Sequence, residues 1–182
     1  MSEQPELRTP RLILRRPRLR DAPRIATLLN NYEVTKNLAR VPYPYTFNMA
    51  VDWLVRQKRD WSPDSVTFAI VLPDDGLIGF CGMHREGRLA EIGYWLGEPY
   101  WGHGFATEAA HALIDLAFRA TAIERLHVSC HAINGGSRRV IHKCGFQFSS
   151  MGMADSLAAG NVPVERYVLD RRTWIGLRSW QS

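Results

Sequence analysis

Hydrophobic residues recur along the chain in two patterns, and the first of these predicts strands. Short apolar runs bounded by turn residues are typical of strands. Two such runs flank Pro73-Asp-Asp-Gly76, which predicts a hairpin, and a second turn at Arg85–Arg88 leads into another run. The predicted strands are Leu12–Leu14, Thr67–Leu72, Leu77–Met83, Leu89–Leu96, Leu126–Cys130, Phe146–Met153 and Val164–Leu169.

The second pattern, apolar residues three or four positions apart, predicts helices. We expect Asp21 and Asn48 to cap the first two, and Gly145 to stop a short one that begins near Gly136. A long helix follows Gly104, and the last predicted helix spans Asp170–Ser179. The segments 32–47 and 154–163 lack either pattern and are predicted to be irregular.

The order of these elements indicates the fold class. Hairpins followed by strand–helix–strand–helix–strand imply an α+β fold with one mixed, mostly antiparallel central sheet flanked by helices. At 182 residues the chain fits a single domain with a substantial core.

A glycine-containing turn, EPYWGHGFATEA (98–109), lies between a predicted strand and the long helix. Gly102 and Gly104 have no Cβ, so successive backbone N–H groups can point at a bound anion, and the helix dipole adds its positive end. A P-loop would need a Lys-Ser/Thr pair after the glycines, and a dinucleotide site a third glycine near Thr107. The turn therefore predicts a different phosphate-bearing ligand; the alternative is a tight turn without one.

A second motif, NGGSRRVIHKCGF (134–146), follows the strand at Leu126–Cys130. Together the two motifs resemble the acetyl-CoA-binding core of the GNAT superfamily of N-acetyltransferases. The segments RTPRLILRRPRLRDA (8–22) and AEIGYWLG (90–97), with the N-x-x-S spacing, are similar to the RimJ/RimL-type branch, whose members acetylate protein N-termini or small amines. The resemblance covers residues 9 to about 172, and implies a single GNAT-like domain that uses acetyl-CoA and no metal. We therefore place this domain at residues 9–172, with residues 1–8 and 173–182 as terminal extensions.

The resemblance also implies where acetyl-CoA lies, with its phosphates on backbone amides from about Gly102 to Ala106. The family usually has Gln or Arg where Trp101 stands, which matters little if backbone amides do the binding. Asn134 would hydrogen-bond the pantetheine arm or only make the turn, and His103 would touch a phosphate or be an exposed loop histidine. The full set of expected cofactor-binding residues is Trp95, Leu96, Trp101, Gly102, His103, Gly104, Phe105, Ala106, Thr107, Asn134 and Arg138.

Acetyl transfer to an amine needs a base, because a lysine-type amine has a pKa of about 10.4 and an α-amine about 8. Glu91 is an acidic residue inside an apolar strand, next to the cofactor turn, where burial would raise its pKa. The resemblance places a glutamate on this strand as well, acting directly or through water. The alternative is a glutamate on the solvated side of the strand, with His84, Glu86 and Glu98 as other candidates.

The leaving thiolate, with a thiol pKa of about 8.5, benefits from a proton or a hydrogen bond. Many GNAT enzymes use a tyrosine seven positions after the asparagine, where this chain has Ile141. RimJ/RimL-like members instead have a serine three positions after it, which matches Ser137. A serine hydroxyl is a weak acid, so we expect Ser137 to hydrogen-bond the thiolate, to cap the short helix, or both.

Composition excludes several other classes of function. The chain is 46% apolar and 23% charged, and no apolar run approaches the ~20 residues of a membrane span. Three cysteines without CxxC spacing, and an N-terminus without a signal-peptide layout, predict a cytoplasmic protein with reduced thiols. His127 and His131 would lie about 13 Å apart on a strand, too far to share an ion, so we predict no metal site.

The net charge of +5 is unevenly distributed, with seven arginines between Arg8 and Arg24 and a cluster at Arg138, Arg139 and Lys143. No nucleic-acid-binding motif accompanies these residues, and a coenzyme with three phosphates would also favour a basic rim. The partner that the resemblance implies is an amine acceptor, either a protein N-terminus, as of a ribosomal protein, or a small molecule, and a homodimer is left open. The competing hypothesis is a non-catalytic domain that binds CoA or nucleic acid through its basic face.

The acceptor pocket is expected to form from the segment 32–47, the helix over 48–59 and the loop 154–163. Tyr43, Tyr45, Trp53 and Trp61 would make part of it aromatic, which suits a cation or an apolar side chain. The alternative is that these aromatic residues are core or dimer contacts.

Overall fold

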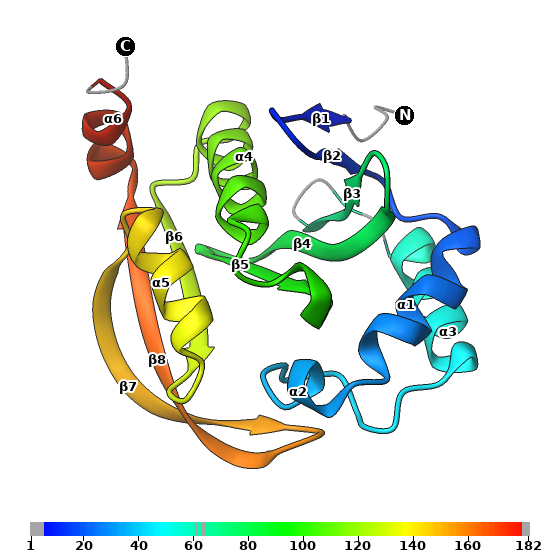
Figure 1. Cartoon of the computed structure of the whole chain (residues 1–182). Coiled ribbons are helices and arrows are strands. Elements are labelled where there is room, and N and C mark those ends of the chain that lie inside the picture. The colour runs from blue at the N-terminus through cyan, green and yellow to red at the C-terminus, as the bar shows by residue number, and fades with distance from the viewer. Residues whose placement is uncertain (1–5, 61, 63–64, 180–182) are drawn as a thin grey trace.

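The computed structural model describes residues 6–60, 62 and 65–179. In this part of the chain an eight-stranded sheet has the order β1-β2-β3-β4-β5-β6-β8-β7 (Figure 1). Neighbouring strands are antiparallel except β5 and β6, which are parallel, as the predicted mixed sheet requires. The strands are β1 (Leu7–Arg8), β2 (Ile13–Arg15), β3 (Ser65–Leu72), β4 (Gly76–Glu86), β5 (Leu89–Leu96), β6 (Arg125–His131), β7 (Gln147–Ser156) and β8 (Gly160–Asp170).

Helices cover both faces of the sheet, which confirms the predicted α+β class (Figure 1). One face packs on α1 (Ala22–Leu29), α2 (Tyr32–Thr35) and α3 (Phe47–Arg59), and the other on α4 (Phe105–Ala120), α5 (Gly135–Lys143) and α6 (Arg171–Ser179). Two short 3₁₀ helices, η1 (Leu19–Asp21) and η2 (Glu98–Tyr100), precede α1 and α4.

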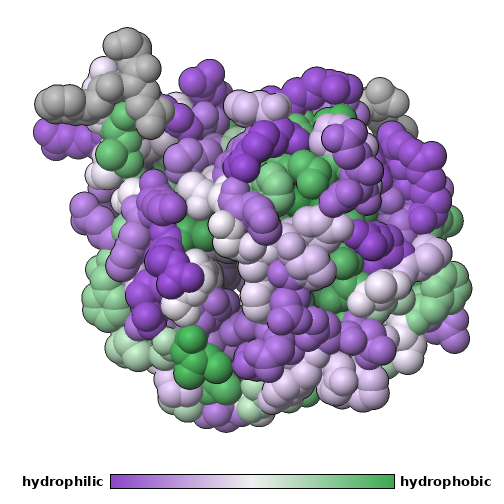
Figure 2. Space-filling model, in the orientation of Figure 1, coloured by the Kyte–Doolittle hydropathy of each residue, from purple (hydrophilic) through white to green (hydrophobic). Residues whose placement is uncertain are grey.

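The core is divided by the sheet because successive strand residues point to opposite faces. Ala69 and Phe80 contact the α1–α3 side, whereas Phe68 and Cys81 belong to the cluster around α4. Outside the core, Figure 2 shows hydrophobic side chains in separate groups on a mostly hydrophilic face. No helix in the described part of the chain is long and apolar enough to span a membrane.

Three predicted elements differ from the structure. Thr46 caps α3 in place of Asn48, and its hydroxyl accepts a hydrogen bond from Met49 N at 3.3 Å. The apolar pattern did not predict this start, because Phe47, the first residue of the helix, is 52% exposed and lies outside the apolar stripe. Residues 32–35 form α2 where an irregular segment was predicted. Strands β7 and β8 stay paired as far as Ser156 and Gly160, so the predicted loop 154–163 is a tight hairpin. The apolar pattern missed it because backbone hydrogen bonds form this ladder whether or not the side chains are apolar.

Asp21 precedes α1 as predicted, but its carboxylate does not cap the helix. It accepts hydrogen bonds from Arg15 Nη1 at 2.9 Å and Nη2 at 2.7 Å, and from Arg18 N at 2.8 Å. The Arg15 and Asp21 side chains are only 13% and 6% exposed, so each charge depends on the other. This ion pair fixes the path of the chain from β2 into α1.

The termini of the described chain belong to the same domain. β1 adds an edge strand that begins at Leu7, and α6 packs on α4 through Trp174. The Trp174 indole N–H donates to Asp115 Oδ1 at 2.9 Å, and its ring stacks on Phe118 with centroids 5.2 Å apart. Elements from both predicted extensions therefore pack on the domain placed at residues 9–172.

We expect Asp21→Ala to lower the free energy of unfolding by about 3 kcal/mol, because Arg15 would stay buried without its partner. Urea denaturation followed by circular dichroism measures this loss. The control is Asp60→Ala, since its partner Arg59 is 69% exposed and exposed ion pairs contribute little to stability. Equal losses in the two variants would contradict the stabilising role of the buried pair.

Candidate active site

Strands β5 and β6 pair at one point and then separate. Their register, over two strands described in full, consists of the pair Glu91↔His127, whereas β4 and β5 stay paired as far as Gly79↔Leu96. Beyond Glu91 the edge of β5 that faces β6 is therefore outside the sheet ladder. Its backbone N–H and C=O groups are available to an extended ligand that lies in the split.

The split is reached from both faces of the sheet by different side chains of β5. Glu91 and Trp95 point to the α1–α3 face, and Tyr94 and Leu96 to the α4 face, because side chains alternate along a strand. An acidic group and a phenol therefore lie on opposite faces of the same strand, at the position where β6 leaves it.

The glycine turn leads from β5 into α4. Gly102 and Gly104 have φ values of +78° and +82°, a left-handed conformation that L side chains rarely adopt. Gly104 is the N-cap of α4, and no side chain caps the first turn of that helix. The N–H groups there are thus available to an anion, as the spacing of the glycines predicted.

The turn between β1 and β2 holds this glycine turn from outside. Arg11 donates from Nη1 to His103 O at 2.8 Å and from Nε to Glu108 Oε2 at 2.7 Å, and its guanidinium lies 4.6 Å from the Phe105 ring centroid. Thr9 Oγ1 and Arg11 N donate to Glu108 Oε1 at 2.6 and 2.8 Å. Sequence analysis missed this clamp because Arg11 and Glu108 are 97 positions apart.

The clamp keeps Glu108 ionised. Burial alone would raise the pKa of Glu108, but hydrogen bonds from Thr9 and Arg11 outweigh burial and lower this pKa below its ordinary value. A carboxylate in the first turn of α4 also interacts favourably with the positive end of the helix dipole. The carboxylate in turn orients the guanidinium of Arg11 beside the glycine turn.

Ser137 lies on the α4 side of the split, where Tyr94 contacts it. Tyr94 Oη is 2.9 Å from Ser137 Oγ and 3.2 Å from Ser137 O, and Asn134 Oδ1 accepts from Ser137 N at 3.0 Å. Asn134, rather than Ser137, therefore caps α5. Burial raises the pKa of Tyr94, so its hydroxyl stays protonated. Sequence analysis sought a tyrosine at position 141 and missed Tyr94; Ile141 is a core residue.

Glu91 lies on the exposed side of β5, so the expected burial of this residue is wrong. Its Oε1 accepts from Ser129 Oγ at 3.0 Å. His84 is its cross-strand neighbour on the same face, and His84 Nδ1 is 3.3 Å from Ser65 Oγ. Glu91 and His84 are thus both open to an acceptor from the α1–α3 face. Glu98, in contrast, hydrogen-bonds Asn31.

The remaining residues expected to bind the cofactor differ in whether a ligand can reach their side chains or only their backbone. Leu96 and Phe105 are 5% and 9% exposed, so their backbone is what a ligand can reach. Leu96 O accepts from the Trp101 indole N–H at 2.8 Å, and Trp101 itself is 41% exposed. Trp95 packs on Phe80, His103 is exposed and stacks on Phe105, and Ala106 and Thr107 are half-buried in the first turn of α4.

Arg138 is held by an acidic residue on β8. Its Nε and Nη2 donate to the two carboxylate oxygens of Glu165 at 2.8 and 2.9 Å, and this interaction lowers the pKa of Glu165. The Arg139 guanidinium instead lies over the start of α5, 3.7 Å from where a Cβ of Gly135 would be. Arg139 is therefore the arginine that faces the N-terminus of α5.

The residues expected at the acceptor pocket lie on the α1–α3 face, but mostly as packing residues. Tyr45 is buried and Trp53 packs on Phe80 with centroids 4.9 Å apart, whereas Tyr43 is exposed; Trp61 lies outside the described residues. The β7–β8 hairpin reaches this segment, since Leu157 N donates to Ala39 O at 3.0 Å (Figure 1). This contact joins the β7–β8 hairpin to the segment between α2 and α3.

Thiol and metal chemistry have no support among the described residues. No three His, Cys, Asp or Glu residues there gather where they could hold a metal ion. All three cysteines are buried, and burial raises the pKa of Cys81 and of Cys144 to about 12. Such thiols stay protonated and unreactive.

Comparison with known proteins agrees with this geometry. Residues 11–147 match the family model of the acetyltransferase (GNAT) domain. An uncharacterized N-acetyltransferase, p20 of Bacillus licheniformis, is 31% identical over 177 residues, covering 93% of this chain and 98% of that protein. A ribosomal-protein-serine acetyltransferase of Escherichia coli is 32% identical over 80 residues, covering 42% of this chain and 45% of that protein.

The fold has close structural counterparts as well. A solved structure of RimL, a ribosomal L7/L12 alpha-N-protein acetyltransferase in complex with coenzyme A, superposes with a TM-score of 0.75 at 20% identity, covering 89% of this chain and 95% of that one. The chain therefore belongs to the GNAT family of acetyltransferases. It is an acetyl-CoA-dependent N-acetyltransferase, and it is similar to proteins of the RimJ/RimL type.

The clamp on the glycine turn yields a prediction. Glu108→Gln should lower the free energy of unfolding at pH 7 by about 1–2 kcal/mol and raise KM for acetyl-CoA, because the turn loses its charged anchor. Since folding lowers the pKa of Glu108, its contribution is present above the unfolded-state value of about 4.3 and is lost as pH falls through the lower folded-state value. Thermal melting between pH 7 and pH 3 should show the two proteins converging in acid.

Proposed function

We propose that this enzyme acetylates a primary amine by direct attack on acetyl-CoA bound in the split between β5 and β6. The observation that carries this proposal is the placement of Glu91 on one face of β5 and of Tyr94 with Ser137 on the other. The acceptor amine has to lose a proton and the leaving thiolate has to be stabilised, and the two faces provide a group for each.

The residues around the split fit the parts of a coenzyme with phosphates and an amide-containing arm. Gly102 and Gly104 allow a close approach to backbone N–H groups at the start of α4, with Arg11 adjacent. The unpaired edge of β5 offers donors and acceptors to the amides of the arm. When bound, the coenzyme supplies the activated acetyl group as a thioester.

Glu91 acts as the base in this scheme. It takes a proton from the acceptor amine, directly or through a water molecule, because its carboxylate is exposed on the α1–α3 face. Ser129, which donates to Glu91 Oε1 at 3.0 Å, fixes the orientation of that carboxylate. His84, the neighbour across the β4–β5 ladder, is the second group on this face that can accept a proton.

Ser137 acts on the leaving sulfur, with Tyr94 as a positioning residue. If Tyr94 donates to Ser137 Oγ, the serine proton is directed away from the phenol and towards the split. Ser137 then hydrogen-bonds the thiolate as negative charge develops on it. The neutral Tyr94 therefore takes part without losing its own proton.

The acceptor we propose is the N-terminal amine of a protein, as in the ribosomal-protein acetyltransferases to which this chain is similar. An exposed Glu91 on an open sheet face suits an extended peptide. Thiol release from acetyl-CoA, followed with a panel of N-terminal peptides and small amines, tests this, with mass spectrometry of the product. Turnover with small amines alone would contradict the protein acceptor, and CoA binding without turnover of any amine would favour a non-catalytic domain.

Replacing the base should change the pH dependence of turnover. Glu91→Gln keeps the shape of the side chain but accepts no proton, so kcat/KM should fall most at low pH and partly recover as the amine deprotonates unaided. The pH–rate profile of wild type and variant between pH 6 and pH 10 measures this. An unchanged profile would remove Glu91 from the mechanism, and the same experiment with His84→Gln would then test the next candidate.

Removing the hydroxyl groups on the other face should affect kcat. Ser137→Ala and Tyr94→Phe should each lower kcat by roughly tenfold while KM for acetyl-CoA stays nearly the same, because the interaction forms mainly in the transition state. The double variant should be little worse than Ser137→Ala, since Tyr94 acts through Ser137. Multiplicative losses in steady-state kinetics would mean that Tyr94 acts independently.

A further inference from the structure

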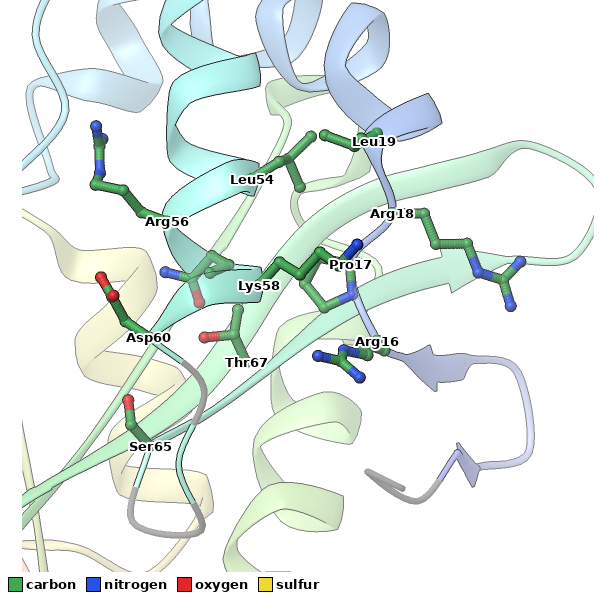
Figure 3. Close-up of a pocket in the computed structure, with 11 residues that line it drawn as sticks. Arg16, Pro17, Arg18, Leu19, Leu54, Arg56, Lys58, Asp60, Ser65 and Thr67 are labelled. Carbon is green, nitrogen blue, oxygen red and sulfur yellow. The ribbon is translucent and has the colours of Figure 1, made fainter. Parts of the chain in front are cut away.

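A cavity of about 420 Å³ lies where η1, the end of α3 and the start of β3 meet, two strands away from β5 (Figure 3). Ser65 and Thr67 form its β3 wall, and they point to the α1–α3 face, because they alternate in step with Ala69 of that core. The cavity therefore opens on the same face of the sheet as Glu91.

The lining of this cavity is strongly cationic. Arg16, Arg18, Arg56 and Lys58 contribute to it, and none of the four forms an ion pair within the described part of the chain. Figure 3 shows Arg16 and Lys58 beside Pro17 at the centre of the group, with Arg18 and Arg56 extending away from it. These charges attract an anion.

The carboxylate at the rim does not offset this charge. Asp60 accepts two hydrogen bonds from Arg59, at 2.7 and 3.0 Å, and the hydrogen bond from Arg59 lowers the pKa of Asp60. The Asp60 charge is therefore already matched by a guanidinium that does not line the cavity. The four cationic side chains that line the cavity therefore leave it with a net positive charge.

The strand register connects the cavity to Glu91. Ser65 pairs with His84 and His84 pairs with Glu91, so the two ends of this row are two strand spacings, about 10 Å, apart. The residue between them, His84, is exposed, so this row is accessible to a chain that lies across the sheet.

We propose that this cavity is a subsite of the acceptor, binding an acidic side chain of the molecule whose amine lies at Glu91. The proposal rests on the proposed function and adds a substrate class to it, namely protein N-termini with acidic residues close to the amine. A separation of about 10 Å corresponds to about three residues of extended chain, so the acidic residue belongs near position three or four.

The test uses three octapeptides with the same N-terminal Ser-Ala, followed by two aspartates, two asparagines or two lysines. For the wild-type enzyme we expect kcat/KM to be about tenfold higher with the aspartate peptide than with the asparagine peptide, with the difference in KM, because the charge contacts form equally in ground and transition states. The lysine peptide should be poorer still. Raising the salt concentration should reduce the preference.

The double variant Arg16→Ala, Lys58→Ala should bring the aspartate and asparagine peptides to within about twofold, with KM for acetyl-CoA unchanged. Both side chains are exposed, so the fold should persist. The matched control is Arg20→Ala, an exposed arginine of η1 that does not line the cavity, which should keep the full preference.

Failure of this proposal is distinguishable from failure of the proposed function. Equal kcat/KM for the three peptides, or a preference that survives the double variant, would overturn the subsite and leave acetyl transfer standing. If no peptide is acetylated, the protein acceptor fails, and calorimetry with N-terminally acetylated versions of the same peptides decides the subsite. Tighter binding of the aspartate form that is lost in the double variant supports it, and equal affinities overturn it.

Discussion

The separation of β5 from β6 after the pair Glu91↔His127 is the constraint on which the rest of the site depends. A parallel pair that continued along the strands would use the backbone groups of β5 in the ladder and close the sheet. Because the strands part, β5 is a strand with one edge inside the sheet and one edge free for a ligand. The same split makes the free edge of β5 accessible to Glu91 on one face of the sheet and to Tyr94 and Ser137 on the other.

The edges of the split are held by contacts between distant parts of the sequence. Tyr94 joins β5 to α5 through Ser137, and Leu157 joins the β7–β8 hairpin to Ala39. Arg11, near the N-terminus, holds the glycine turn through His103 O. These contacts hold the groups that line the split in place, and such preorganisation favours the positioning of a ligand.

Charge is organised around the same split. The start of α4 and the adjacent Arg11 make one end positive, where the coenzyme phosphates are proposed to bind. The cavity beside η1 places a second positive region on the acceptor face. Two other arginines form ion pairs within the fold: Arg15 pairs with Asp21, and Arg138 pairs with Glu165. The basic character of the chain therefore has several separate physical causes, and ligand binding accounts for only part of it.

The sequence alone determined the fold class, most of the strands and the glycine turn, because each depends on local chemistry. The hairpin between β3 and β4 follows from the apolar runs on either side of the turn Pro73–Gly76, and β5 was predicted at its observed limits. The left-handed residues Gly102 and Gly104 also needed glycine at those positions, whatever packs around them. The catalytic roles of Glu91 and Ser137 were inferred from the family resemblance and from the position of Glu91 in its strand, and they stay predictions.

Only the tertiary structure decided which side chains meet. Three contacts join residues that are far apart in sequence: the Arg11–Glu108 clamp, the Tyr94–Ser137 contact and the Arg138–Glu165 ion pair. No local pattern encodes such pairs, because they depend on how the strands are ordered and twisted in space. The exposure of Glu91 was misjudged for a related reason: periodicity shows that a strand has two faces, but only packing determines which face is covered.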